Sequence, residues 1–191
     1  MLIPRQETEL LVHILKNDFT WQTPHIIDIG TGSGCIACSL ALELEDAVVT
    51  GFDISEGALA VAKKNASSLS AKATFEPLDI LTQDIPKREL DLIVSNPPYV
   101  MHKERLEMNA NVLDNEPDLA LFVSDEDPLL FYRSIAQKGK SALKKNGLLF
   151  FEINEQFGLE VEKLMIETGY NQTKIHKDLH GKARFVSGFS Q

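Results

Sequence analysis

Four consecutive residues, Asn96-Pro97-Pro98-Tyr99, have the properties needed to hold a planar NH2 group. They follow the apolar run at residues 90–95, which is typical of a buried strand. The Asn96 carboxamide oxygen and a backbone carbonyl could accept both N–H bonds of such a group, which leaves its nitrogen face open to an electrophile. The prolines fix φ and lack N–H donors, and the Tyr99 ring could stack on the bound group. The alternative interpretation is a proline-rich turn that only ends a strand.

A second candidate site is the glycine-rich segment Asp28-Ile29-Gly30-Thr31-Gly32-Ser33-Gly34, which lies between a predicted strand and a predicted helix. Glycines allow a ligand to approach the backbone closely. Asp53 ends the next predicted strand, where a carboxylate accepts hydrogen bonds from ribose hydroxyls. Asp79 and Ile80 follow the third predicted strand, where an adenine amine and ring could be bound.

The details of the glycine segment favour a cationic cofactor without phosphates. Its spacing is GxGxG rather than the GxGxxG of dinucleotide-binding proteins. Asp28 stands two residues before the first glycine, where its charge would repel a pyrophosphate. S-adenosylmethionine is a cofactor that tolerates such a carboxylate. A nicotinamide or flavin cofactor, or a glycine turn that serves only strand–helix packing, remains as an alternative.

The elements that must position these residues alternate along the chain. Short apolar strands separated by helices predict a mainly parallel sheet covered on both faces, and the last two strands predict an antiparallel hairpin. The polar segment at residues 100–127 is long for a compact domain, which is typical of a functional loop. Helices are predicted at residues 7–17, 35–45, 55–67, 128–144 and 156–168, and strands at 25–29, 47–52, 73–78, 91–95, 148–153, 170–177 and 183–189.

Composition narrows the class of protein. The chain has 191 residues, of which 43% are hydrophobic and 25% charged, as expected for one globular domain. The net charge of −9 argues against direct DNA binding, which needs clustered basic residues. No apolar run is long enough for a membrane span, and no signal peptide is evident. We therefore expect a cytoplasmic protein.

Several other residues are given structural interpretations. Cys35 and Cys38 are predicted to be small core residues of a helix, without a disulfide framework. The five histidines are scattered, so we expect no metal site. The Lys63-Lys64 pair and the charged run from Lys138 to Lys145 are interpreted as solvated helix faces.

Taken together, these features resemble the HemK/PrmC family of class I protein-glutamine N5-methyltransferases, which modify peptide-chain release factors. The resemblance covers almost the whole chain. Residues 3–9 look like the family's PRPxTE segment with Gln6 in place of proline, residues 28–34 like its motif I, and residues 96–99 match its NPPY signature. The remaining landmarks are Glu116-Pro117 with Ala120-Leu121, Glu152-Ile153 with Gln156, and Asp178 with Gly181 and Arg184.

The chain also departs from the family pattern. Family members usually carry an amino-terminal helical domain, and residues 1–20 here contain only an opening segment and a helix. We therefore expect residues 1–191 to be the catalytic domain alone, which would bind cofactor better than its protein substrate. The family's glycine-rich stretch after Leu121 is replaced by residues 122–127.

The resemblance implies a Rossmann-like α/β fold with a mainly parallel seven-stranded sheet. It implies methyl transfer from S-adenosylmethionine to the amide nitrogen of the glutamine in a release factor's Gly-Gly-Gln loop, with S-adenosylhomocysteine as product. Arg5 and Glu9 would lie near the cofactor, or else form a helix cap and a surface ion pair. The implied catalytic and substrate-binding residues are Asn96, Pro97, Pro98 and Tyr99, and the implied cofactor-binding residues are Asp28, Ile29, Gly30, Thr31, Gly32, Gly34, Asp53, Ile54, Asp79, Ile80 and Asn96.

Three other functions remain open. A related enzyme could methylate a ribosomal-protein glutamine. A nucleic-acid methyltransferase could act on an exocyclic amine such as that of adenine, since such enzymes share the NPPY motif, but it must also grip the nucleic-acid backbone. A binding module could keep the fold without activity.

Overall fold

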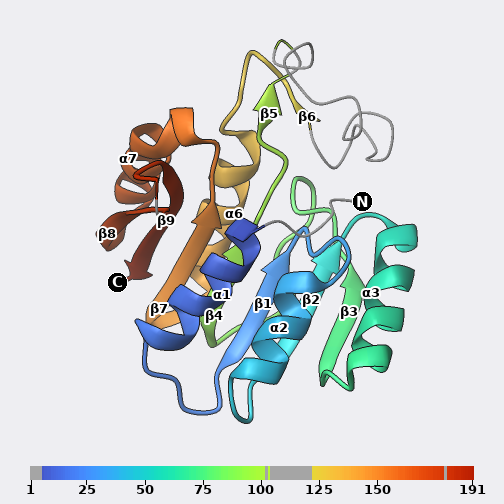
Figure 1. The fold of residues 1–191 in the computed structure, drawn as a ribbon. Coiled ribbons are helices and arrows are strands. Elements are labelled where there is room, and N and C mark those ends of the chain that lie inside the picture. The colour runs from blue at the N-terminus through green and yellow to red at the C-terminus, as the bar shows by residue number, and fades with distance from the viewer. Residues whose placement is uncertain (1–5, 102, 104–121, 179) are drawn as a thin grey trace.

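A seven-stranded sheet runs through the computed structural model, which describes residues 6–101, 103, 122–178 and 180–191 (Figure 1). The strand order is β3-β2-β1-β4-β7-β9-β8. Neighbours from β3 to β7 pair in parallel, whereas β9 is antiparallel to both β7 and β8. This confirms the predicted fold class. The strands are β1 (His25–Ile29), β2 (Val48–Asp53), β3 (Ala73–Pro77), β4 (Leu90–Ser95), β7 (Leu143–Glu152), β8 (Tyr170–Lys177) and β9 (Ala183–Ser190).

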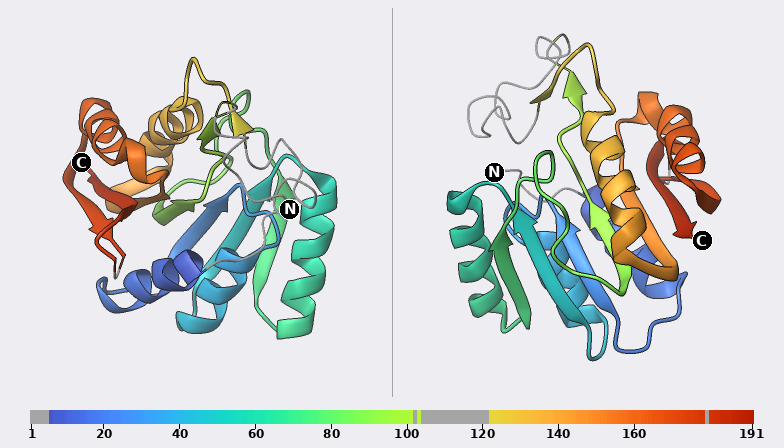
Figure 2. Two further views of the ribbon diagram at one scale, coloured as in Figure 1. Left: turned by 45° about the horizontal axis from the view of Figure 1, so that its top comes forward. Right: turned by 180° about the vertical axis from the view of Figure 1, so that it is seen from behind.

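Helices cover both faces of the sheet, as Figure 2 shows from two further directions. Successive strand residues point to opposite faces, so Ile26 joins the core beneath α1, α2 and α3, while Ile27 joins the core beneath α6 and α7. Burial on both sides explains why the strands read as continuous apolar runs. The helices are α1 (Gln6–Asn17), α2 (Cys35–Glu43), α3 (Glu56–Leu69), α6 (Leu130–Ala142) and α7 (Gly158–Thr168).

None of the helices in the described part of the chain is both long enough and apolar enough to cross a bilayer.

The predicted boundaries around β7 were wrong. The helix expected to reach residue 144 ends at Ala142, and β7 begins at once at Leu143 instead of at residue 148. Leu143 pairs with Leu90 before an irregularity in the register, and Asn146 has a positive φ of 61°. A Cβ on Gly147 would lie 2.8 Å from the Leu90 carbonyl oxygen. Gly147 therefore permits close approach of two strands and does not stop a helix.

The two ends of the polar segment at residues 100–127 meet in a small parallel ladder that the sequence did not predict. It is formed by β5 (Val100–Met101) and β6 (Phe122–Val123). Strands of two residues are too short for periodicity to reveal. Residues 96–99 come directly before β5. The ladder therefore brings β6, at the end of the polar segment, close to them.

Helix ends elsewhere lie within two residues of the predicted ones. The Ser55 hydroxyl accepts a hydrogen bond from the Ala58 N–H at 3.2 Å and caps α3. The helix predicted at residues 156–168 begins as a 3-10 turn, η2 (Glu155–Phe157), and continues as α7. Gly169 ends α7 with a φ of 95°.

Candidate active site

The predicted site residues meet at the edge of the sheet where β1, β2 and β4 end, at the top of Figure 1. Ile29 pairs with Phe52 of β2 and with Ser95 of β4, so the residues that follow these three strands are neighbours. The Ser95 hydroxyl donates to the Ile29 carbonyl at 2.7 Å and ties β4 to β1 at this point. The glycine-rich segment, Asp53 and Asn96 therefore lie together, as the sequence predicted.

Glycine is required in the loop after β1 because the chain turns back over the end of β2. The N–H groups of Gly30 and Thr31 both donate to the Phe52 carbonyl, at 2.8 and 2.9 Å. Gly30, Gly32 and Gly34 have positive φ values of 72°, 55° and 76°. A Cβ on Gly34 would lie 2.9 Å from the Ala62 Cβ, so that glycine also allows α2 to pack on α3. The result is a loop with bare backbone facing the space beside Asn96.

The glycine loop and the Asn96 segment are neighbours at the sheet edge. A Cβ built on Gly30 would find the Asn96 backbone oxygen 4.0 Å away, in ordinary contact. A molecule bound by the loop would therefore lie beside the residues that follow β4.

Asp53 is held in one orientation by the backbone on both sides of it. One carboxylate oxygen accepts from the Gly32 N–H at 2.9 Å, and the other accepts from the Ser55 N–H at 2.9 Å. A carboxylate oxygen can accept more than one bond, so both oxygens keep capacity for ligand hydroxyls. Ile54, the next residue, is 64% exposed and offers an apolar surface at the rim. This arrangement suits a ribose with an attached ring.

Asp28 lies beneath the loop with no exposed surface. One carboxylate oxygen accepts from the Thr31 hydroxyl at 2.6 Å, and the other has no hydrogen-bond partner among the described residues. Burial is the main cause that raises the pKa of Asp28 to about 7; the hydrogen bond from Thr31 opposes this shift, and the nearby charge of Asp53 adds a smaller part of it. Asp28 therefore supplies a full negative charge at neutral pH only if a bound cation favours its ionised form.

The buried Asp28 carboxyl should make the protein less stable as the pH rises from about 4 to above 7. Because the fold raises this pKa from 3.8 to about 7, the folded chain keeps a proton that the unfolded chain has lost, and the free energy of unfolding falls with rising pH. Asp28→Asn keeps an oxygen for the Thr31 hydroxyl and has no such proton. Thermal melting of the ligand-free proteins across this pH range should show a flatter dependence for Asp28→Asn; parallel curves for the two proteins would contradict the assignment.

The turn after β3 uses most of its polar groups internally. The Asp79 carboxylate accepts from the Leu81 N–H at 3.0 Å and from the Thr82 hydroxyl at 2.7 Å. The Thr82 hydrogen bond lowers the pKa of Asp79, so this side chain stays ionised. Ile80 is 7% exposed and belongs to the core beneath α6, so little of its side chain can contact a ligand ring.

The segment Asn96–Tyr99 presents an amide at the sheet edge and anchors its tyrosine in the core. Asn96 is half-buried, and the described part of the chain provides no hydrogen-bond partner for its carboxamide. Pro97 is buried, whereas Pro98 and Tyr99 are half-buried. The Tyr99 hydroxyl donates to a carboxylate oxygen of Glu152 at 3.4 Å.

Glu152 contacts the candidate site through Tyr99, a contact that the sequence did not reveal. It ends β7 next to the last strand pair Ser95–Phe151 and is 5% exposed. Its backbone carbonyl accepts from the buried Tyr132 hydroxyl at 3.2 Å. An acidic residue directly after the apolar run at residues 148–151 was the signal in the sequence, but its partner Tyr99 lies far away in the chain.

Of the lysines in the run from Lys138 to Lys145, only Lys145 is exposed; Lys138, Lys140 and Lys144 are half-buried and have partners, which corrects the sequence interpretation for these three. Lys138 donates to the carbonyls of Ile80 and Gln83, at 2.6 and 2.7 Å. Lys140 donates to the Gly169 carbonyl, and Lys144 lies 3.1 Å from the Asp91 carboxylate. Charge pattern alone cannot show such partners, because they come from distant parts of the chain.

The cysteines lie in α2, and neither is activated. Cys38 is buried and Cys35 half-buried. Burial raises the pKa of both thiols, that of Cys38 to about 11, so they stay protonated at neutral pH. Within the described residues, no three His, Cys, Asp or Glu side chains are arranged to hold a metal ion.

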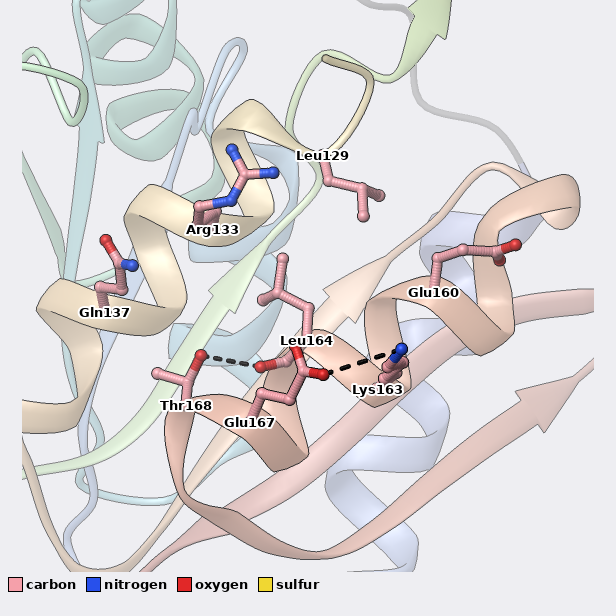
Figure 3. A pocket seen from close by; sticks show the side chains of 8 residues that line it. All are labelled: Leu129, Arg133, Gln137, Glu160, Lys163, Leu164, Glu167 and Thr168. Carbon is pink, nitrogen blue, oxygen red and sulfur yellow. Dashed lines mark hydrogen bonds and ion pairs between the residues drawn. The ribbon is translucent and has the colours of Figure 1, made fainter.

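An open groove of about 470 Å³ lies between α6 and α7, away from the glycine loop and Asn96 (Figure 3). Three of its charged residues have partners: Lys163 lies 3.8 Å from Glu167, and the two terminal guanidinium nitrogens of Arg133 donate to Asp127. The groove has none of the predicted site residues, and we assign it no function. Its lining residues are Leu129, Arg133, Gln137, Glu160, Lys163, Leu164, Glu167 and Thr168.

The other landmarks of the sequence lie outside this site or outside the described residues. Asp178 caps the β8–β9 turn by accepting from the His180 and Lys182 N–H groups, and its hydrogen bond from Arg184 lowers its pKa to about 2. Glu9 is exposed on α1. The predictions for Arg5 and for residues 116–121 fall on positions that the structure does not describe.

Comparison with known proteins identifies similar chains. Residues 6–119 match the model of the family described as "Methyltransferase small domain". The release factor glutamine methyltransferase of Bacteroides thetaiotaomicron is 48% identical over 188 residues, which cover 98% of this chain and 67% of that protein. The protein of the same name from Lactococcus lactis is 40% identical over 188 residues, which cover 98% of this chain and 68% of its own. The chain thus spans about two thirds of the length of these relatives.

Solved structures share the fold at low sequence identity. A methyltransferase from Pyrococcus furiosus has a TM-score of 0.68 and 16% identity, over 97% of this chain and 83% of its own. The magnesium protoporphyrin IX methyltransferase of Synechocystis, solved with bound S-adenosylmethionine, has a TM-score of 0.62 and 17% identity, over 97% of this chain and 79% of its own. At these identities the likeness shows the fold alone.

Proposed function

The chain belongs to the release factor glutamine methyltransferases, within the wider methyltransferase small domain family, and on this premise we propose that it methylates the side-chain amide nitrogen of a glutamine in a peptide-chain release factor. The methyl donor is S-adenosylmethionine, and the target is the glutamine of the Gly-Gly-Gln loop. The observation that carries the proposal is the proximity of the glycine loop at Gly30 to the Asn96 backbone. This proximity supports the proposal, because a donor bound by the glycine loop would lie beside the residues that we assign to the glutamine amide.

The chemical problem is the weak nucleophilicity of the target. The lone pair of an amide nitrogen is delocalised into its carbonyl group, and the nitrogen becomes positive as the new N–C bond forms and the S–C bond breaks. Catalysis must therefore come from alignment and from electrostatic stabilisation of that charge. When bound, S-adenosylmethionine supplies the electrophilic methyl group and leaves as the neutral thioether S-adenosylhomocysteine.

The segment after β4 supplies the alignment in this proposal. The Asn96 side-chain oxygen and the Pro97 carbonyl accept the two N–H bonds of the glutamine amide, which orients its nitrogen and stabilises its developing charge. Tyr99 packs against the plane of the amide, and its bond to Glu152 fixes the ring. Pro98 keeps the loop rigid. The extra proton leaves the nitrogen for water after methyl transfer, so these residues need not include a strong base.

The residues present fit the cofactor. The glycine loop lacks Cβ atoms at Gly30 and Gly32 and can pass close to the amino-acid part of the donor. Asp53, fixed by two backbone N–H groups, would accept bonds from the ribose hydroxyls. The adenine would lie between exposed Ile54 and the turn after β3. Asp28 would be ionised by the nearby sulfonium charge.

The test is methylation of a purified release factor. We expect S-adenosylmethionine and this protein to add one methyl group to the glutamine of the Gly-Gly-Gln loop, as mapped by mass spectrometry of peptides. The Asn96→Ala protein is the control and should add the methyl group at least about 10²-fold more slowly. Cofactor binding is measured separately by calorimetry, so that poor docking of the release factor can be distinguished from a missing donor site.

Ribosomal proteins and DNA are included as competing substrates in the same assay. Methyl transfer to a ribosomal-protein glutamine or to a DNA amine, with none to the release factor, would refute the proposed substrate. The net charge of −9 makes backbone binding of DNA unfavourable. The proposed reaction takes place in the cytoplasm, where a release factor would be encountered.

A further inference from the structure

The turn at residues 79–83 is attached to helix α6 by hydrogen bonds from two side chains. The Lys138 ammonium donates to the Ile80 carbonyl at 2.6 Å and to the Gln83 carbonyl at 2.7 Å. The Ser134 hydroxyl donates to the same Ile80 carbonyl at 2.7 Å. Ser134 and Lys138 are four residues apart and so lie on one face of α6. Both side chains are half-buried.

The other hydrogen bonds of the turn are formed between its own residues. The Asp79 N–H donates to the Gln83 side chain at 2.8 Å, and the Gln83 N–H donates to the Asp79 carbonyl at 2.8 Å. The Asp79 carboxylate caps Leu81 and Thr82. Within the described residues, the hydrogen bonds that join residues 79–83 to another element all come from α6. Besides the packing of Ile80 in the core, the hydrogen bonds from Ser134 and Lys138 therefore fix the position of the turn.

The turn is also joined in sequence to the cofactor site. The residue before it, Leu78, donates its N–H to the Asp53 carbonyl at 3.0 Å. In the proposed site, a shift of this turn would thus move the protein surface that lies beside the adenine ring. Asp53 itself is fixed by Gly32 and Ser55 and would remain in place.

We infer that Ser134 and Lys138 are positioning residues for the adenine side of the cofactor site, and that they act by fixing the turn at residues 79–83. This inference rests on the proposed function, because it assumes an adenosine cofactor. Neither side chain touches the cofactor. Their effect is on affinity for the base and on discrimination between bases.

The test is binding of S-adenosylhomocysteine to the Lys138→Met protein, measured by calorimetry. Methionine keeps much of the side-chain length and removes the donor. We expect affinity to fall about 10-fold, since a charged hydrogen bond to two carbonyls is lost. Lys140→Met is the matched control, because Lys140 lies on the same helix and also donates to a backbone carbonyl, that of Gly169. Its affinity should stay within about two-fold of that of the unmodified protein.

Binding of a second ligand distinguishes a role in positioning the turn from a general loosening of the cofactor site. S-inosylhomocysteine carries a carbonyl oxygen where adenine carries its amine, and the unmodified protein should bind it more weakly. Lys138→Met should reduce this preference for adenine, while Lys140→Met should preserve it. Equal weakening of both ligands by Lys138→Met, or an equal effect of the two lysine substitutions, would overturn the inference.

Ser134→Ala decides the question if Lys138→Met does not fold. It removes one of the two donors to the Ile80 carbonyl and should shift affinity and base preference in the same direction, by a smaller factor. Unchanged binding by a folded Ser134→Ala protein would then overturn the inference. Failure of the unmodified protein to bind S-adenosylhomocysteine would instead refute the proposed function itself.

Discussion

Asn96→Ala is expected to lower the rate of methyl transfer by at least about 10²-fold, while affinity for S-adenosylhomocysteine stays within about two-fold. The carboxamide stands at the end of β4 without a partner in the described part of the chain, so its removal breaks no bond of the folded protein. Its oxygen acts on the glutamine amide, whose N–H bonds become stronger donors as positive charge develops. The loss should therefore appear mainly in kcat.

Single-turnover rates with saturating donor measure this effect, and calorimetry measures donor affinity. Asn17→Ala serves as the control, because Asn17 ends α1 and contacts only His13 among the described residues. A parallel loss of donor affinity in Asn96→Ala would show that Asn96 holds the cofactor rather than the amide. A change in Tm as large as that of a core substitution would show a structural role.

Asp53→Ala is expected to weaken binding of S-adenosylmethionine by about 1.5–3 kcal/mol, or roughly 10- to 150-fold. Two effects add. The ribose loses a charged acceptor, and the Gly32 and Ser55 N–H groups lose the carboxylate that fixes them. The second effect loosens the glycine loop, so the loss should exceed that of one ligand hydrogen bond.

Asp53→Asn distinguishes these two effects. Its carboxamide has one acceptor oxygen for two backbone N–H groups and places an NH2 group against one of them. It should therefore bind the donor no better than Asp53→Ala if fixing the loop dominates, and better if the ribose contact dominates. Asp18→Ala, at an exposed position after α1, is the control for removal of one negative charge. Unchanged donor affinity in Asp53→Ala would remove Asp53 from the site.

Residues that directly follow strands could be placed from the sequence alone. Parallel neighbours end at the same edge of a sheet, so Gly30, Asp53 and Asn96 had to meet once β1, β2 and β4 were recognised. The positive φ values of the glycines agree with a tight turn at that edge. Local pattern and topology were sufficient for this part of the site.

Contacts between distant segments could not be predicted. Lys138 reaches a carbonyl 58 positions earlier in the chain, and its charge alone suggested only a solvated face. Residues 143–147 have the composition of a helix end, yet all of them belong to β7, whose first residue, Leu143, pairs with Leu90 of β4. The burial of Asp28 depends on how the glycine loop covers it, which its position before the loop does not reveal.

The order of the last three strands has a consequence for synthesis of the protein. β9 follows β8 in the chain but lies between β8 and β7. A ribosome-bound chain that has not yet exposed β9 leaves the hydrogen-bonding edge of β7 open, beside the phenylalanines at positions 150 and 151. Such an edge pairs readily with other chains. Chains truncated before residue 183 should therefore aggregate more readily than the chain that includes β9.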